Sequence, residues 1–105
     1  MVMVLGLLGN VFHEADALGE ERFARAFSLV EHGMHRVEVF RRLGKPEYKA
    51  DGFYLGSREG FEAEYAAAAA SPSDYYYVWY RSSDAVFTIG FSNDDIVTFK
   101  AAGRK

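Results

Sequence analysis

The chain has 105 residues, of which 50% are hydrophobic and 16% aromatic, and this composition predicts one folded domain rather than a disordered tail. Its net charge is −3 and its pI is about 5.6, so we expect no basic surface to bind nucleic acid. The sequence has no cysteine, which excludes disulfides, thiolate metal sites and thiol nucleophiles.

The first segment, residues 1–18, is predicted to be an apolar N-terminal arm. Its apolar run, from Val2 to Phe12, is shorter than the roughly 20 residues that cross a bilayer. A signal peptide is the alternative, but no basic residue precedes the run. Cytoplasmic and periplasmic locations therefore both stay open. Because a small domain has little surface left to cover the arm, we expect a homodimer in which the arm supplies much of the contact.

A single domain is predicted over residues 19–105, and it begins with a helix. Between residues 19 and 32 the apolar residues recur at steps of three and four, flanked by charged ones. Gly33 is expected to take a positive φ and to end this helix.

A second helix is predicted from Arg36 to Leu43. His35 takes the position of its N-terminal cap, with Glu38 as the partner in a capping box. Gly44 is expected to end the helix.

An insertion at about residues 47–74 precedes the predicted sheet. Residues 53–55 are a candidate short strand, and the alanine-rich stretch from 57 to 70 favours a helix. Five consecutive alanines, residues 66–70, leave little side chain to pack, so this helix either lies close against another element or forms a surface lid.

Three strands are predicted at residues 75–80, 85–91 and 96–99. The short turn-forming segments between them, residues 81–84 and 92–95, predict an antiparallel meander.

The fold class is therefore predicted as α+β, with two N-terminal helices packed on one face of a three-stranded antiparallel sheet and a helical segment inserted before that sheet. One core is expected between the helices and the sheet. Its expected members are Phe27, Val39, Leu43, Phe87, Ile89 and Phe91.

Two short motifs stand out in this order of elements. They are Gly33-Met34 followed by a short helix ending Leu43-Gly44-Lys45-Pro46, and Trp79-Tyr80 followed by Phe87-x-Ile89-x-Phe91. The sequence thereby resembles the SmpA/OmlA family, the family of the outer-membrane assembly lipoprotein BamE, whose fold is shared by the repeats of β-lactamase inhibitor protein. The resemblance implies a bacterial protein that works by contact with another protein. The chain departs from that family in its insertion and in lacking a cysteine for a lipid anchor, so no stable membrane anchor is expected.

Catalysis and metal binding find little support in the residue spacing. Two groups of possible ligands, residues 13–16 and the pair His32 and His35, lack the spacing of a metal site, because a helix break at Gly33 separates the pair. The serines fall in predicted turns or caps, without a nucleophile elbow. We therefore expect no enzyme, no metal and no cofactor.

Aromatic residues of the first predicted strand and of the insertion are the candidate binding surface. Alternation divides Tyr75, Tyr77 and Trp79 from the other set on this strand, Tyr76, Val78 and Tyr80. A sheet covered on one side only must expose one of the two sets, and the first set is the candidate. Together with Tyr54 and Tyr65 they predict a surface for protein contact. The competing interpretation is that the inserted helix covers the exposed face.

The function predicted from these features is that of a non-catalytic protein-protein interaction module with an unidentified protein partner. The alternative is a small-ligand-binding domain, in which the tyrosine-rich sheet and the insertion enclose a pocket for an aromatic or sugar-like molecule.

Overall fold

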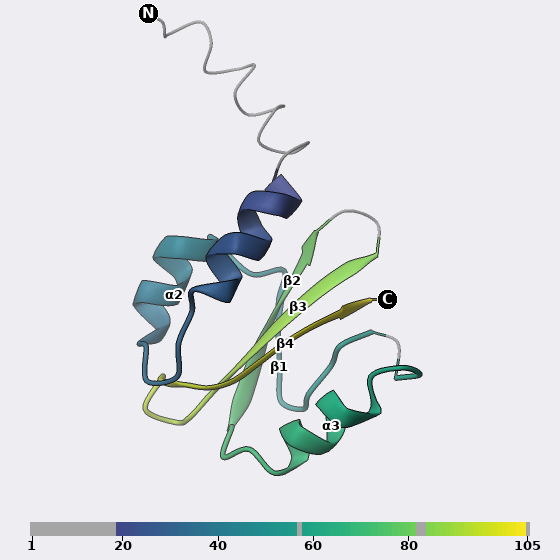
Figure 1. The fold of residues 1–105 in the computed structure, drawn as a ribbon. Helices are drawn as coiled ribbons and strands as arrows, with labels where there is room; N and C mark the ends of the chain where they lie inside the picture. Colours follow the sequence, from purple (N-terminus) through teal and green to yellow (C-terminus); the bar gives the residue numbers. More distant parts are fainter. Residues whose placement is uncertain (1–18, 57, 82–83, 105) are drawn as a thin grey trace, which may run out of the picture.

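The computed structural model describes residues 19–56, 58–81 and 84–104, so the predicted arm lies outside the described residues. The fold is α+β (Figure 1). Its elements are a first helix described over residues 19–28, α2 (Arg36–Leu43), β1 (Tyr48–Ala50), α3 (Glu62–Ala69), β2 (Tyr75–Arg81), β3 (Ala85–Phe91) and β4 (Val97–Arg104). Within these described ranges, no helix has the length and apolar character needed to cross a membrane.

The sheet has four strands in the order β1-β2-β3-β4, and each pairs antiparallel with the next. The meander of the last three strands is confirmed, but the prediction of a three-stranded sheet is wrong. The additional strand, β1, belongs to the predicted insertion and pairs with β2 through Tyr48 and Val78. Three residues are too few to show a strand periodicity. The stretch predicted as a strand, residues 53–55, has no strand structure.

The last strand is much longer than predicted. β4 runs on through Ala101, Ala102 and Gly103, which have low strand propensity, because it pairs with β3 as far as Ala85 opposite Arg104. Tertiary pairing therefore overrides local preference along half of this strand.

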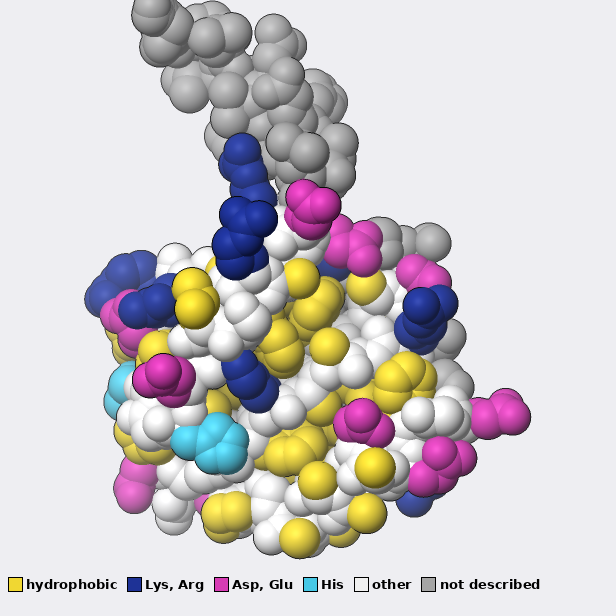
Figure 2. All heavy atoms as spheres, in the orientation of Figure 1, with side chains coloured by type: hydrophobic (Ala, Val, Ile, Leu, Met, Phe, Trp, Pro, Cys, Tyr) yellow, Lys and Arg dark blue, Asp and Glu magenta, His cyan; other side chains and the backbone are white. Residues whose placement is uncertain are grey.

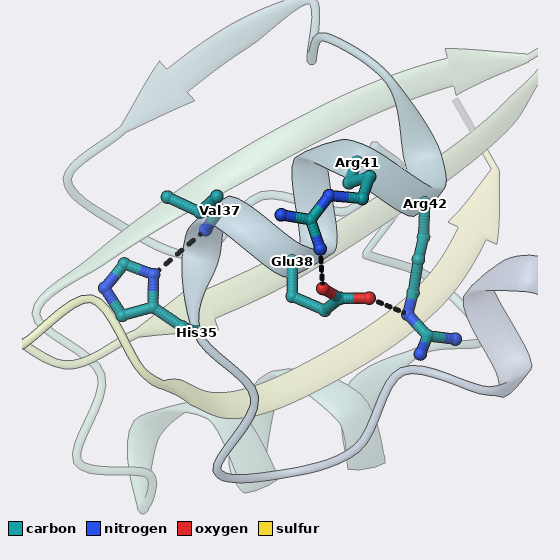
Figure 3. Close-up of polar contacts among 5 residues, drawn as sticks. All are labelled: His35, Val37, Glu38, Arg41 and Arg42. Atoms are coloured by element: carbon teal, nitrogen blue, oxygen red, sulfur yellow. Dashed lines mark hydrogen bonds and ion pairs between the residues drawn. The ribbon is translucent and has the colours of Figure 1, made fainter.

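His35 and Gly44 bound α2 as predicted, and the predicted positive φ of Gly33 is confirmed, but Gly33 does not end the first helix. Gly33 has a φ of 93°, and the backbone N–H of Val37 donates to Nδ1 of His35 over 3.0 Å, at the start of α2. The predicted capping-box role of Glu38 is wrong. Its carboxylate instead accepts hydrogen bonds from Arg41 and Arg42, one helical turn further on (Figure 3).

The first helix ends earlier than predicted, at residue 28 rather than 32. The ammonium of Lys100 on β4 donates to the carbonyl oxygens of Phe27 and Ser28 over 2.9 and 3.0 Å. A cation thus binds carbonyl groups at the helix end, where the carbonyl oxygen of Phe27 also accepts from the backbone N–H of Val30 over 3.1 Å.

One core lies between the first helix, α2 and the sheet. It contains all six residues predicted for it, which is confirmed by their burial: Phe27, Val39, Leu43, Phe87, Ile89 and Phe91. Trp79, also in this core, is fully buried and donates from Nε1 to the carbonyl oxygen of Gly44 over 3.1 Å.

A second core covers the opposite face of the sheet, where the insertion packs. Leu55 and Ala68 of the insertion lie there against Tyr76, Val78 and strand residues of β3 and β4. Both faces of the sheet are therefore covered, with the two N-terminal helices on one side and α3 on the other (Figure 1). α3 is shorter than the predicted helix of residues 57–70.

Candidate interaction surface

Three of the predicted binding residues lie under the N-terminal helices. Trp79 is 0% exposed and Tyr75 is 9% exposed, while Tyr77 is half-buried against Phe40, with ring centroids 5.0 Å apart. The prediction of an exposed row formed by Tyr75, Tyr77 and Trp79 is therefore wrong.

The other two predicted residues lie on the opposite face of the sheet. Tyr65 packs against Phe53 at 4.7 Å between ring centroids and accepts a hydrogen bond from the backbone N–H of Leu55 over 3.2 Å. Tyr54 is half-buried in the same layer, where its ring lies 6.0 Å from that of Tyr48. The five predicted residues thus form no common surface. The competing interpretation, in which the insertion covers the second face, is the one that the burial of Tyr76 supports.

Tyr75 has a structural role at the end of the sheet. Its hydroxyl donates to the carboxylate of Asp95, whose carbonyl oxygen accepts from the backbone N–H of Arg36 over 2.8 Å. The Arg36 guanidinium lies 3.7 Å from the same carboxylate, and the Lys49 ammonium lies 4.5 Å from the centre of the Tyr75 ring. Burial and the hydrogen bond to Asp95 raise the pKa of Tyr75, and the same hydrogen bond lowers the pKa of Asp95. These groups join α2, β1 and β2 to the turn before β4.

An unpaired strand edge is the feature of this fold that is best suited to binding. β4 is the last strand of the sheet and pairs with β3 alone. On the outer side of β4, its first residue, Val97, exchanges backbone hydrogen bonds with Gly33 over 3.0 Å and Met34 over 2.9 Å. From residue 98 to 104, the outer edge of β4 forms no backbone hydrogen bond with another described segment. About 20 Å of strand edge is therefore unpaired among the described residues.

A shallow groove runs beside this open edge. Ala63, Glu64 and Ala67 of α3 form one wall and residues 99–102 of β4 form the floor of a hollow of about 350 Å³, which we call the β4 groove. The alanine side chains of this wall are short and apolar, and Glu64 is its charged residue. Hydrophobic side chains show on this face between the first helix and α3, with charged side chains around them (Figure 2).

The opposite side of β4 is held by Lys100. Its ammonium lies 5.3 Å from the centre of the Phe27 ring and bonds the end of the first helix, and burial lowers the pKa of Lys100. Lys100 forms part of the floor of the β4 groove, but its ammonium thus binds carbonyl oxygens at the end of the first helix.

A second hollow of about 420 Å³ lies on the other side of α3. Asp51, Arg58, Tyr65 and Ala69 are among its lining residues, and the Arg58 guanidinium lies 4.4 Å from the centre of the Tyr65 ring. Of the five predicted binding residues, only Tyr65 lines this hollow.

Within the described ranges, no three side chains of the metal-binding types lie together. His35 serves as the helix cap, and residues 13–16, which the sequence already disfavours as metal ligands, fall outside these ranges.

No pattern in the sequence predicts the β4 groove. The run of small residues in α3 and the strand residues from 101 to 103 carry its only signal, which becomes meaningful once the two segments lie side by side.

Comparisons with family models, curated proteins and solved structures find no match to this chain.

Proposed function

We propose that the chain is a non-catalytic protein-interaction module that binds an extended polypeptide segment along the outer edge of β4. The open edge from residue 98 to 104, beside the β4 groove, is the observation that carries this proposal. An added strand would satisfy the free backbone groups and place alternate side chains against α3.

The apolar character of the groove defines the kind of segment that fits. Ala63, Ala67, Phe99 and Ala101 offer aliphatic and aromatic carbon, and Lys100 directs its charge to the first helix. A segment rich in β-branched and aliphatic residues and without acidic side chains is therefore the preferred ligand, because most of the lining is apolar and Glu64 would repel an acidic group.

The resemblance to the SmpA/OmlA family supports the same class of function, since that family works by protein contact. Its arrangement of two helices before an antiparallel meander is similar to the order found here, with β1 and α3 added between them. We therefore also propose that the two helices and the meander are arranged as in BamE.

Alanines on α3 provide a matched test. Ala67 lines the β4 groove, whereas Ala66 is exposed on the same helix without lining either hollow. A photoreactive benzoyl-phenylalanine at position 67 of the full chain would trap the bound segment, and mass spectrometry would identify it. The corresponding synthetic peptide should then bind the wild-type chain and Ala66→Arg, and should bind Ala67→Arg at least about tenfold more weakly.

Hydrogen exchange locates the bound peptide. The amides of residues 98–104 should become protected when the peptide binds, because the new strand pairs with them. A peptide that binds Ala67→Arg as well as wild type, or that leaves β4 unprotected, would overturn the proposal.

A small-ligand site is the second candidate, favoured by the hollow beside Tyr65. Its volume of about 420 Å³ lies within the range of known ligand pockets, and Arg58 and Asp51 supply polar groups at its wall. A thermal-shift screen with aromatic and sugar-like compounds tests it. A true ligand should stabilise the wild type and Ala67→Arg but not Ala69→Arg, which fills this hollow.

A further inference from the structure

We infer that the segment bound in the β4 groove is the apolar stretch Val2–Leu8 of a second copy of this chain, exchanged reciprocally in a homodimer. This inference rests on the proposed function, since it names the partner of the same strand edge.

Residues 2–8 match the β4 groove in chemical character. Residues 2–8 are Val-Met-Val-Leu-Gly-Leu-Leu, a stretch without charge or side-chain hydrogen-bonding groups. The groove that flanks β4 is built largely from alanines and Phe99, its lysine is engaged by helix carbonyls, and its carboxylate, on Glu64, disfavours acidic segments. The ligand preferred by the groove and this stretch of the chain therefore have the same chemistry.

The linker between residues 2–8 and the described chain is long enough for this contact. The described chain starts close to the end of β4, because Glu20 lines one hollow together with Ala102, Gly103 and Arg104. Ten residues, 9–18, separate the apolar stretch from the first described residue, and such a linker spans up to about 33 Å. β4 itself is eight residues long, about 27 Å. The apolar stretch can therefore reach the edge of a β4 strand that lies next to residue 19 of its own chain.

Pairing of residues 2–8 with a second copy is favoured over pairing within the same molecule, because only the second copy covers the outer edge of the added strand. If residues 2–8 paired with β4 of their own chain, they would become the new edge strand, uncharged and apolar, which is the kind of edge that aggregates. In a reciprocal dimer the two added strands pair with each other. The result is one continuous sheet through both copies, without an open apolar edge at the dyad.

Mass measurement by light scattering is the first test. The full chain should have a mass near twice 11.8 kDa. Val4→Glu and Ala67→Arg should each yield a folded monomer, because each places a charge at the proposed contact. Asn10→Asp and Ala66→Arg are the matched controls and should remain dimeric. A dimer that survives both Val4→Glu and Ala67→Arg would overturn the inference.

The absence of native cysteines permits a direct test of exchange. A chain carrying Val4→Cys is mixed with a chain carrying Ala67→Cys and oxidised, and the expected product is a disulfide-linked heterodimer. Replacing the second chain by Ala66→Cys should reduce its yield several-fold. If instead a single chain carrying both Val4→Cys and Ala67→Cys forms an internal disulfide as a monomer, the segment docks on its own molecule and the inference is wrong.

The outcomes also separate this inference from the proposed function. A monomeric full chain whose photoreactive position 67 traps a segment of another protein, with protection of β4, overturns the second copy and supports the binding role of the edge. A dimer formed through other residues, with no protection of β4 by any trapped segment, overturns both.

Discussion

The hydroxyl of Tyr75, at the start of β2, donates a hydrogen bond to the carboxylate of Asp95 in the turn that precedes β4. Asp95 has a φ of 67°, and its backbone carbonyl accepts from the N–H of Arg36 at the start of α2. One residue in a left-handed conformation thus connects the sheet, the turn and the helical layer. The tyrosine that alternation suggested as a binding residue instead holds the fold together.

The Asp95 carboxylate should make stability depend on pH. Its pKa in the folded state lies below the usual 3.8, first because of the hydrogen bond from Tyr75. The unfolded state therefore binds more protons between the two pKa values, so this contribution is present above about pH 4 and is lost as pH falls through the folded-state pKa. Urea unfolding at a series of pH values should show a smaller acid dependence for Asp95→Asn. Asp94→Asn, at the exposed neighbour, should behave as wild type.

Gly33 should tolerate no side chain, for reasons of backbone conformation alone. A Cβ at this position would meet no atom within 4 Å, but its φ of 93° is disfavoured for any residue other than glycine. Gly33→Ala should lower the free energy of unfolding by about 1 kcal/mol or more. Gly52→Ala is the control, because Gly52 also has free space and lacks a positive φ. Equal unfolding midpoints for the two variants would contradict this explanation.

Truncation of the core beneath the N-terminal helices should be costly. Ile89 is 0% exposed on the helix-facing side of β3, so Ile89→Ala should cost about 2–5 kcal/mol from lost burial and the cavity left behind. Val37→Ala, at a side chain that is 54% exposed, should cost less than about 0.5 kcal/mol. Denaturant midpoints measure both, and similar losses would show that the assignment of this core is incorrect.

Lys100 should hold the first helix against β4. Lys100→Met keeps the aliphatic stem but removes both hydrogen bonds to the carbonyls of Phe27 and Ser28. Hydrogen bonds to charged groups contribute about 1.5–3 kcal/mol each, and water compensates part of this loss. Amides of residues 19–30 should therefore exchange faster in Lys100→Met while those of β2 stay protected. Unchanged exchange in the helix would show that the lysine is dispensable there.

Local chemistry predicted several elements at the right residues. His35 and Gly44 define the second helix through capping and backbone conformation, which depend on neighbours in the sequence. β3 was predicted with its exact bounds, because alternating apolar residues flanked by turn formers are a strong local signal.

The capping-box role predicted for Glu38 is wrong because two arginines of the same helix bind its carboxylate, which is a local contact. Other features were decided by contacts between distant segments. β1 and the second half of β4 form only because neighbouring strands supply the backbone partners.

By itself, the sequence determined the α+β class, the boundaries of α2 and one core, because each follows from residue type and periodicity over short distances. Which aromatic face is buried, and where a strand edge stays open, was decided by the tertiary structure. Alternation divides Tyr75 from Tyr76 but assigns neither to solvent, and here helices cover the first and the insertion covers the second. The β4 groove likewise exists only where α3, more than thirty residues away in sequence, packs beside the edge strand, because burial and pairing are properties of the assembled layers.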